Sequence, residues 1–406
     1  MTLFLLIALV FGAVAADVSD NIKQHQQGNL QFSINVFKKL VESDSDNVLV
    51  CPLSAEIALA MTLLGAKGET QRQLAAGTQL PPHPDKLKSI FSELLPQLES
   101  SDKYTFELAN KIYVHNNFKI RQDYRQSVID DFKADIENID FKLKHGAVAT
   151  INKWVGDKTH DKIQGILEPD NINDDTRLVL LNAMYFKGEW VKGFKEENTK
   201  QQPFYVDGSH YVSTNMMSTK GSFRYYEDVE NKVRLLEMPY KGDEVTMTIV
   251  LPDDPEGLTK LANNLENVIV NPSLFSTHQV NLAVPKFKID SSIKFSEILK
   301  SFGVILPFMD GANFQGMIGD NISEQLKIDE VLQKATIEVD EKGTVAAAVT
   351  SVTMQLWRSA KIYKDINFHA DHPFIFYIRH KVAGITFIGK YVKPEGTIQN
   401  GIYPIS

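Results

Sequence analysis

A run of 15 residues near the C-terminus, 343–357, contains neither a charged residue nor a proline. If the run is a β-strand, both of its faces accept burial, because they carry small, apolar and hydroxyl side chains and one glutamine. The preceding segment, 334–341, alternates apolar and polar residues and predicts a strand of its own. A single strand over the 24 residues 334–357 would far exceed the usual length of about 3–10 residues. We therefore expect the run to continue that strand or to fold back beside it, with Gly343 supplying the bend.

The uncharged run leads into Trp357, Arg358 and Ser359, and the following residues, 360–365, include two lysines and an aspartate. The bond between Arg358 and Ser359 is of the kind that trypsin-like proteases cut. The uncharged run could be buried as a strand in a sheet, and a cleavable bond follows it. This combination suggests a loop that becomes a strand after proteolysis. The alternative is a plain buried strand, which the composition by itself favours.

The rest of the chain predicts one large α+β domain, with helices concentrated early and sheets dominating late. A length of 406 residues suggests two or three domains, but no internal repeat and no Pro/Gly/Ser-rich linker divides the sequence. Apolar residues make up 43% of the chain, which is ample for a large core. Helical spacing predicts helices, one of them with Ser54 as N-cap and an end near Gly65, within 31–43, 54–70, 84–99, 122–135 and 148–159. Apolar or alternating runs predict strands within 177–186 and 279–289 and strand pairs within 233–252 and 374–392.

The N-terminus resembles a secretory signal. Residues 3–14 form an uncharged apolar stretch followed by small residues, with cleavage expected after Ala15 or Ala16. About 14 apolar residues are too few to span a bilayer, which needs roughly 20. We therefore expect a signal peptide over 1–16, a mature domain over 17–406, and a secreted, extracellular protein that is not embedded in a membrane. Asn321 begins a glycosylation sequon, Asn-Ile-Ser.

The chemistry-bearing residues do not form a catalytic motif. The sequence has no G-x-S-x-G, H-E-x-x-H or G-x-x-x-x-G-K-[ST] pattern, so we expect no enzyme, cofactor or metal site, and we interpret His369 and His372 as surface histidines. The net charge of −8 disfavours nucleic-acid binding. Cys51 is the only cysteine, so the fold rests on its core without an internal disulfide. We interpret Cys51 as a small buried hydrophobe; the alternative is a reactive thiol.

Five separated stretches give the chain, from about residue 28 to the C-terminus, a clear resemblance to the serpin family. They are NVLVCPLSAEIALAMTLLGAKGETQRQL, LLNAMYFKGEW, KATIEVDEKGTVAAA, DHPFIFYIRH and FIGKYVKP, in this order. The resemblance implies a single domain with three β-sheets, about nine helices and an exposed reactive-centre loop near the C-terminus, here about 341–365. Most members inhibit serine proteases, some inhibit cysteine proteases, and some inhibit nothing.

The resemblance also implies roles for particular residues. The hinge of the loop would comprise Glu341, Gly343, Thr344, Ala346, Ala347 and Ala348, where small side chains favour an inhibitory member. The region where the main sheet opens would include Cys51, Pro52, Ser54, Asn182 and Trp190. The chain departs from the family in having Cys51 for a usual serine, Gln333 for a frequent histidine and Val345 for a frequent glutamate.

The resemblance implies a suicide substrate for a protease, with no catalytic residues of its own. Family spacing from Glu341 places the cut carbonyl on Trp357, which suits chymotrypsin-like or some papain-like enzymes. A loop longer by one residue places it on Arg358, before Ser359, which suits trypsin-like enzymes; both assignments stay open. The expected partner is a serine protease held covalently, with a papain-like cysteine protease as an alternative, and the protein itself is expected to be a monomer. Lys86 and Lys88 are offset by nearby acids, which disfavours glycosaminoglycan activation without excluding it. The rival functions are a non-inhibitory serpin, such as a carrier or storage protein, and a secreted hydrolase.

Overall fold

The computed structural model describes residues 19–100, 103–269, 272–319, 325–343 and 365–404. Within these ranges no helix is both long and apolar enough to cross a membrane. The expected signal peptide over 1–16 and the sequon at Asn321 lie outside the described residues.

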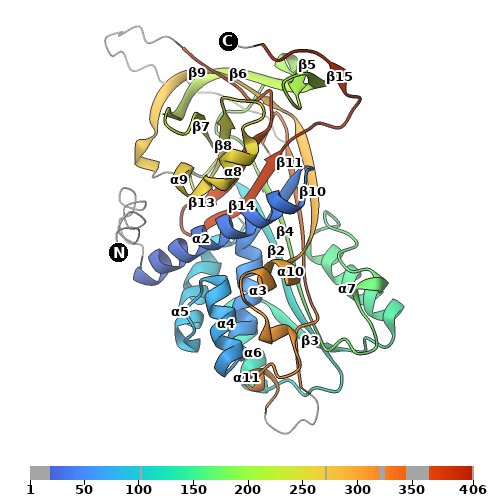
Figure 1. Ribbon diagram of the computed structural model, residues 1–406. Helices are drawn as coiled ribbons and strands as arrows, with labels where there is room; N and C mark the ends of the chain where they lie inside the picture. The colour runs from blue at the N-terminus through green and yellow to red at the C-terminus, as the bar shows by residue number, and fades with distance from the viewer. Residues whose placement is uncertain (1–18, 101–102, 270–271, 320–324, 344–364, 405–406) are drawn as a thin grey trace.

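A five-stranded sheet runs along the middle of the molecule (Figure 1). The pairs β10–β11 and β2–β4 are antiparallel, whereas the pairs β11–β4 and β2–β3 are parallel. The predicted strands at 177–186 and 334–341 correspond to β4 and β11, which confirms both. In order across the sheet, the strands are β10 (Phe287–Lys294), β11 (Glu330–Val339), β4 (Leu178–Gly188), β2 (Tyr104–His115) and β3 (Asp135–Ile139).

The remaining strands form one hydrogen-bonded network. Its strands β5, β6, β9 and β15 lie at the top of Figure 1. The long strand β6 joins its parts, because it pairs with β5 and β15 in its first half, with β9 in its second half and with β7 at its end. Both expected strand pairs are confirmed, as β7–β8 and β13–β14. The network runs β1 (Val48–Val50), β14 (Gly384–Tyr391), β13 (Phe374–His380), β8 (Val245–Pro252), β7 (Val233–Pro239), β6 (His210–Asp228), β9 (Ser276–Pro285) and β12 (Ile366–His369), with β5 (Lys200–Tyr205) and β15 (Gln399–Asn400) on β6.

Ten α-helices lie in the described part of the chain, so the α+β class and the concentration of helices in the first half are confirmed. They are α2 (Asp20–Ser43), α3 (Pro52–Gly65), α4 (Gly68–Thr78), α5 (Pro84–Leu94), α6 (Gln122–Phe132), α7 (Lys144–Lys158), α8 (Leu258–Asn263), α9 (Leu265–Val268), α10 (Phe295–Ser301) and α11 (Gln315–Ile318). Short 3-10 helices are η1 (Leu95–Leu98), η2 (Pro169–Asn171), η3 (Glu196–Asn198), η4 (Pro272–Leu274) and η5 (Leu306–Phe308).

The N-cap assigned to Ser54 is wrong. Helix α3 begins at Pro52, and Cys51 occupies the N-cap position without a side-chain cap bond. Proline suits the first helical position, because its φ is already helical and the N–H that it lacks would have no partner there. Ser54 therefore lies inside the first turn and donates to the side chain of Asn110 instead.

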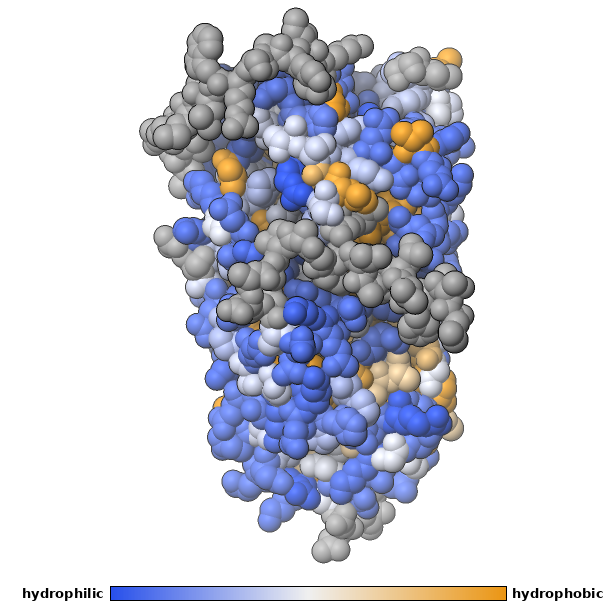
Figure 2. Space-filling view, turned by 90° about the vertical axis from the view of Figure 1, so that its left-hand side faces the viewer, coloured by the Kyte–Doolittle hydropathy of each residue, from blue (hydrophilic) through white to orange (hydrophobic). Residues whose placement is uncertain are grey.

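Both faces of the five-stranded sheet are covered, as the continuous apolar run in β4 predicts. Alternate residues of β4, such as Leu180 and Met184, belong to the main core shared with α3, whereas Val179, Leu181 and Ala183 pack in a smaller core beneath α7. Helices α2 to α6 gather on one side of this sheet and α7 lies on the other (Figure 1). The face of the molecule that lies on the left of Figure 1 is mostly hydrophilic with separated apolar spots (Figure 2).

Candidate functional site

The parallel joint between β4 and β11 is the shortest connection at the centre of the five-stranded sheet. Seven residue pairs, from Glu330–Val179 to Thr336–Tyr185, form this joint. The antiparallel joints on either side are longer, with eight pairs between β10 and β11 and eleven between β2 and β4. Parallel pairing is also slightly less stable per residue than antiparallel pairing. Among the three joints that link β10, β11, β4 and β2, the one between β4 and β11 is therefore the weakest.

The two strands of this joint part before they end. Beyond Thr336–Tyr185, the last residues of β4 pair only with β2 and the last residues of β11 pair only with β10, within the described part of the chain. Both strands run in the same direction, so the unpaired ends lie together at one end of the sheet. The chain leaves β11 at Val339 and turns over this end through the segment 340–343, which we call the hinge turn.

Gly343 presses against the chain that continues from β4. A Cβ atom at this position would lie 2.2 Å from the carbonyl oxygen of Gly188 and 2.7 Å from the Cα of Glu189. Its φ of +136° is also one that L-residues rarely adopt. The bend expected at Gly343 is present, and only glycine fits it.

Backbone and side-chain bonds hold the hinge turn in place. The backbone N–H of Trp190 donates to the carbonyl of Lys342 at 3.1 Å, and that of Phe194 donates to the carbonyl of Glu341 at 2.8 Å. The indole Nε1 of Trp190 donates to the carbonyl of Asp340 at 3.1 Å. The Trp190 ring is 2% exposed and stacks on Tyr240 at 4.2 Å. Trp190 therefore holds the hinge turn in place through its backbone N–H and its indole N–H.

Glu341 is the charged anchor of the hinge turn. Its carboxylate accepts from the hydroxyl of Thr199 at 2.8 Å and from the ammonium of Lys286 at 3.0 Å. Burial opposes ionisation, but a backbone N–H, Lys286 and Thr199 outweigh it and hold the pKa of Glu341 below its ordinary value.

Amide side chains form a row across the middle of the sheet, on three neighbouring strands. Gln333 on β11 lies directly opposite Asn182 on β4, which lies opposite Asn110 on β2. The Gln333 amide donates to the side chain of Asn182 at 2.6 Å, and Asn182 donates to the carbonyl of Leu332 at 3.1 Å. The row therefore bridges the weak joint with neutral hydrogen bonds.

The same row fastens the sheet to the start of α3. Gln333 accepts from the backbone N–H of Cys51 at 2.8 Å and donates to its carbonyl at 2.7 Å. Ser54 donates to Asn110 at 3.1 Å. The Cys51 thiol is fully buried, 2.8 Å from the sulfur of Met184, and burial raises its pKa. These features support the interpretation of Cys51 as a small buried hydrophobe.

The residues expected in one sheet-opening region fall into two groups. Cys51, Pro52, Ser54 and Asn182 lie together at the amide row, whereas Trp190 lies at the hinge turn. Eight positions of extended chain separate Asn182 from Trp190, roughly 26 Å. The hinge residues Thr344, Ala346, Ala347 and Ala348 and the candidate cleavage residues Trp357, Arg358 and Ser359 lie outside the described residues.

Sequence reasoning missed the partners that these residues bind. Gln333 was noted as a departure from the family but not as the bridge, and Lys286 and Thr199 were not singled out. Their partners lie 55 to 282 positions away. The sequence signal that best indicates such a partner is the polarity of Gln333. It is a neutral polar residue inside an apolar strand, where a buried amide needs a hydrogen-bonding partner.

The interpretation of His372 as a surface residue is wrong. His369 is exposed on β12, but the side chain of His372 is fully buried, with Nε2 2.7 Å from the carbonyl oxygen of Pro252. No group of three or more metal-binding side chains occurs in the part of the chain that the structure describes.

Comparisons with known proteins agree on one family. The family model for serpin (serine protease inhibitor) matches residues 27–394. The chain is 35% identical over 377 residues to the leukocyte elastase inhibitor of Xenopus tropicalis, covering 89% of this chain and 97% of the relative. It is 32% identical over 382 residues to the antitrypsin of Bombyx mori, covering 92% and 95%. The crystal structure of Serpin48 of the insect Tenebrio molitor is similar with a TM-score of 0.85 at 32% identity, covering 94% of this chain and 100% of that chain.

Replacing Gln333 with alanine should weaken the joint. Gln333→Ala leaves the N–H and carbonyl of Cys51 and the side-chain oxygen of Asn182 without these partners in a buried place. We expect the free energy of unfolding to fall by about 2–4 kcal/mol, measured by urea denaturation. The control is Gln71→Ala, because the Gln71 amide makes a surface bond to the carbonyl of Pro82. Equal losses in the two variants would contradict the bridging role.

Acid should loosen the hinge turn. A carboxyl whose pKa is lowered by folding contributes stability above its unfolded-state pKa, near the ordinary value of 4.5, and this contribution is lost as the pH falls through the folded-state pKa. We expect Glu341→Gln to reduce stability by about 1–3 kcal/mol at neutral pH. The difference from the natural protein should shrink when urea denaturation is repeated below pH 4.5. Glu197→Gln, at an exposed glutamate nearby, should show neither effect; a pH-independent difference for Glu341→Gln would argue against the charged anchor.

Proposed function

The chain belongs to the serpin family, and we propose that it is a secreted inhibitor of serine proteases that acts as a suicide substrate. The protease takes the reactive loop as a substrate and becomes trapped as an acyl-enzyme when the cut loop enters the five-stranded sheet. Most serpins are inhibitors and not catalysts, which agrees with the absence of a catalytic motif in the sequence. The residues described above would then serve the conformational change and not bond cleavage.

The chemical step belongs to the protease. Its serine hydroxyl attacks the loop carbonyl and forms an ester, while the bond to the following residue breaks and the new amine leaves with a proton from the enzyme's general acid. The loop segment before the cut is then free at one end. If it enters the sheet before water attacks the ester, it carries the attached protease along and distorts its active site, so hydrolysis stalls.

The parted end of the β4–β11 joint is the observation that carries this proposal. Gly343 lies at that end, and the residue after it would be the first to enter. A strand that runs back from Gly343 is antiparallel to both β4 and β11, so one short parallel joint is replaced by two antiparallel joints. This is β-strand addition with a segment of the same chain. The uncharged sequence 344–357 meets the requirement that both faces accept burial.

The energy gained by insertion is large on the scale of protein stability. About a dozen new backbone hydrogen bonds at roughly 0.5–1.5 kcal/mol each give on the order of 10 kcal/mol before ordering entropy is subtracted. The whole stability of a typical domain is about 5–15 kcal/mol. The uncut protein would therefore be a strained state whose relaxation waits for proteolysis.

The other parallel joint in the sheet is clamped, which supports opening at β4–β11. Five pairs join β2 to β3, yet Lys111 on β2 lies 2.9 Å from Asp135 and 2.7 Å from Glu137 on β3. The rings of Tyr113 and Trp154 flank its ammonium at 5.0 and 4.9 Å. Charge-assisted hydrogen bonds are roughly twice as strong as neutral ones. Strands β2, β3 and β4 and helix α7 would then move as one body.

The target follows from the cut bond. Cleavage after Arg358 would select a trypsin-like protease, and cleavage after Trp357 a chymotrypsin-like or papain-like one. The relatives named antitrypsin and leukocyte elastase inhibitor support inhibition of serine proteases. The small residues at 344 and 346–348 disfavour a non-inhibitory carrier or storage protein, because they fit between two strands. The proposal includes removal of the signal peptide 1–16, an extracellular monomer, and glycosylation at Asn321.

Trypsin should form a covalent complex with the protein. We expect a band that survives boiling in SDS, because an ester joins the two chains, and mass spectrometry of the released peptide should place Ser359 at its new N-terminus. Release of a peptide that begins at Arg358 by chymotrypsin, again with a stable complex, would assign the cut to Trp357. The cut protein should also withstand higher temperature than the uncut one. Cleavage without a complex and without added heat resistance would show a mere substrate.

A charge at the hinge should convert the inhibitor into a substrate. Ala348→Lys places an ammonium in the segment that must be buried, which is costly without a partner. We expect SDS-stable complex to be largely replaced by cleaved protein at the same bond, measured by gel densitometry at equal protease ratios. Ala348→Val, which stays apolar, should keep complex formation. Full inhibition by Ala348→Lys would contradict insertion.

A further inference from the structure

The C-terminal segment 396–404 folds back over the hairpin made by β5 and β6. We call this segment the strap. It forms strand β15, whose Gln399 and Asn400 pair with Tyr211 and His210 of β6. Backbone bonds continue beyond the strand, from Gly401 N–H to the carbonyl of Ser209 at 2.9 Å and from Tyr403 N–H to that of Gly208 at 3.2 Å. The family model ends at residue 394, so the strap lies beyond the matched range.

Close packing shows that the strap fits this hairpin specifically. A Cβ atom on Gly401 would lie 2.6 Å from the ring of Tyr211, so glycine is needed for the backbone to lie flat on that ring. The hydroxyl of Tyr211 donates to the side chain of Gln399 at 2.9 Å. In contrast, Ile402 points outward with 83% of its surface exposed.

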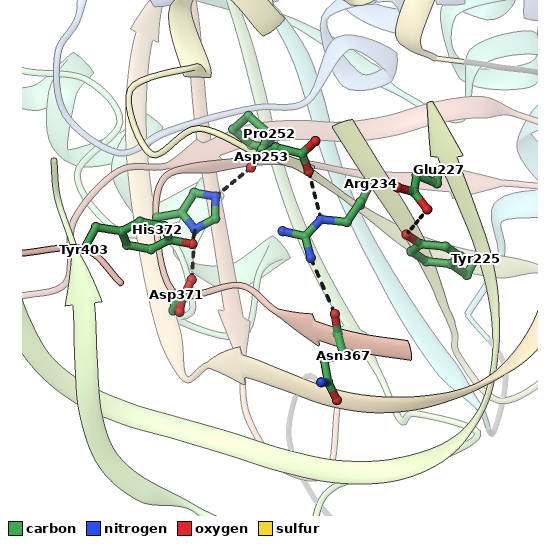
Figure 3. A network of polar contacts seen from close by, with 9 residues as sticks. All are labelled: Tyr225, Glu227, Arg234, Pro252, Asp253, Asn367, Asp371, His372 and Tyr403. Atoms are coloured by element: carbon green, nitrogen blue, oxygen red, sulfur yellow. Dashed lines mark hydrogen bonds and ion pairs between the residues drawn. The ribbon is translucent and has the colours of Figure 1, made fainter. Parts of the chain in front are cut away.

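Tyr403 connects the hairpin to a second part of the chain. Its ring meets the ring of Tyr205 on β5 at 5.1 Å and that of His372 at 5.3 Å, edge to face in both cases. Its hydroxyl lies 3.3 Å from Nδ1 of His372. Burial raises the pKa of Tyr403 to about 12, so the hydroxyl keeps its proton. Figure 3 shows His372 between Tyr403, Asp371 and Pro252.

The Tyr403 hydroxyl suits the contact at His372. The carbonyl of Pro252 only accepts, so Nε2 of His372 carries a hydrogen and donates to it. Nδ1 faces both Asp371 and Tyr403. A hydroxyl both donates and accepts, and it therefore suits Nδ1 whether or not that nitrogen is protonated. The backbone N–H of Tyr205 also donates to the carbonyl of Asp371 at 2.7 Å.

Asp371 and His372 lie one residue beyond the end of β12, the strand that receives the chain after the reactive loop. Strand β12 is an edge strand held by four parallel pairs to β9. Arg234 donates to the carbonyl of Asn367 at 3.4 Å, as Figure 3 shows, and Asn281 donates to its side chain at 2.9 Å. Because β12 is so short, its attachment to the sheet depends on the contacts of the residues at its two ends.

The attachment of β12 to β9 limits how far the uncut loop can enter the sheet, because that loop is tethered at both ends. The 21 residues 344–364 connect the hinge turn to the start of β12. Insertion of about a dozen of them would carry the chain roughly 40 Å into the sheet, and the remaining nine or so could return at most about 32 Å. Full insertion of an uncut loop therefore requires β12 to leave β9.

We propose that the strap fixes the segment after β12 to the β5–β6 hairpin and so keeps the uncut loop from entering the sheet. This inference rests on the proposed function. Its chemistry is the Tyr403 contact with Tyr205 and His372 together with the β15–β6 pairs. The strap slows the spontaneous loss of inhibitor and leaves protease trapping itself unchanged.

The test compares Tyr403→Ala, and a chain ending at Glu395, with the natural protein and with Ile402→Ala as a matched control in the same segment. Each uncut protein is held at physiological temperature, and the fraction that still forms SDS-stable complex with the cognate protease is followed over time. Both strap variants should start with normal activity and lose it at least roughly tenfold faster, which corresponds to a barrier lower by about 1.4 kcal/mol. Mass spectrometry should find the inactive protein uncut, and it should resist heat better. Ile402→Ala should behave as the natural protein does.

Equal lifetimes for Tyr403→Ala and the natural protein would overturn the proposal. Hydrogen exchange of the β12 backbone amides supplies a second measurement that needs no protease, and Tyr403→Ala should speed it roughly tenfold relative to Ile402→Ala. If the natural protein traps no protease at all, the proposed function fails, and unchanged exchange in Tyr403→Ala would then separately overturn the strap's hold on β12.

Discussion

The seven parallel pairs between β4 and β11 set the requirements that the rest of the structure meets. In the proposed mechanism, this joint must form when the chain folds, yet it must give way before the longer antiparallel joints beside it. The bridge across it consists of the neutral amides of Gln333 and Asn182. Neutral hydrogen bonds suit this task, because parting them exposes no buried charge, whereas breaking a buried ion pair leaves an uncompensated charge behind. Charged contacts such as those of Lys111 and Glu341 lie away from this joint.

In the proposed mechanism, the distribution of these charges separates the joint that opens from a joint that stays closed. Lys111 binds β2 to β3 through two carboxylates. Glu341 fixes the hinge turn through Lys286 to the chain that joins β9 to β10, and through Thr199 to the chain that follows β4. The joint between β4 and β11 is bridged by neutral amides. A strand that enters at the hinge turn would therefore part neutral hydrogen bonds and leave the charged β2–β3 contacts intact.

Much of the fold was predictable from the sequence, because its strands carry strong local patterns. The apolar run of β4 and the alternation of β11 were both interpreted correctly, since side-chain period and burial are local properties. The parallel register of the two strands and the amide row were not predictable, because they depend on partners such as Gln333 and Cys51, 282 positions apart. The surface assignment of His372 failed for the same reason: its partners Pro252 and Tyr403 come from other parts of the chain. Nothing in the composition of 396–404 marks it as a docked segment.

The hinge turn and the strap both bear on the lifetime of the uncut protein. A strained state persists because its barriers are high, not because it is the most stable one. At one end of the reactive loop, Gly343 and the bonds of Trp190 hold the chain over the parted strands. At the other end, β12 forms four pairs with β9, and the chain just after it is held at Asp371 and His372. Contacts that are made in the strained state and must break on the way out lengthen its life. In the proposed mechanism, proteolysis cuts the connection between the two anchors, so the first half of the loop can enter the sheet while β12 and the strap remain in place.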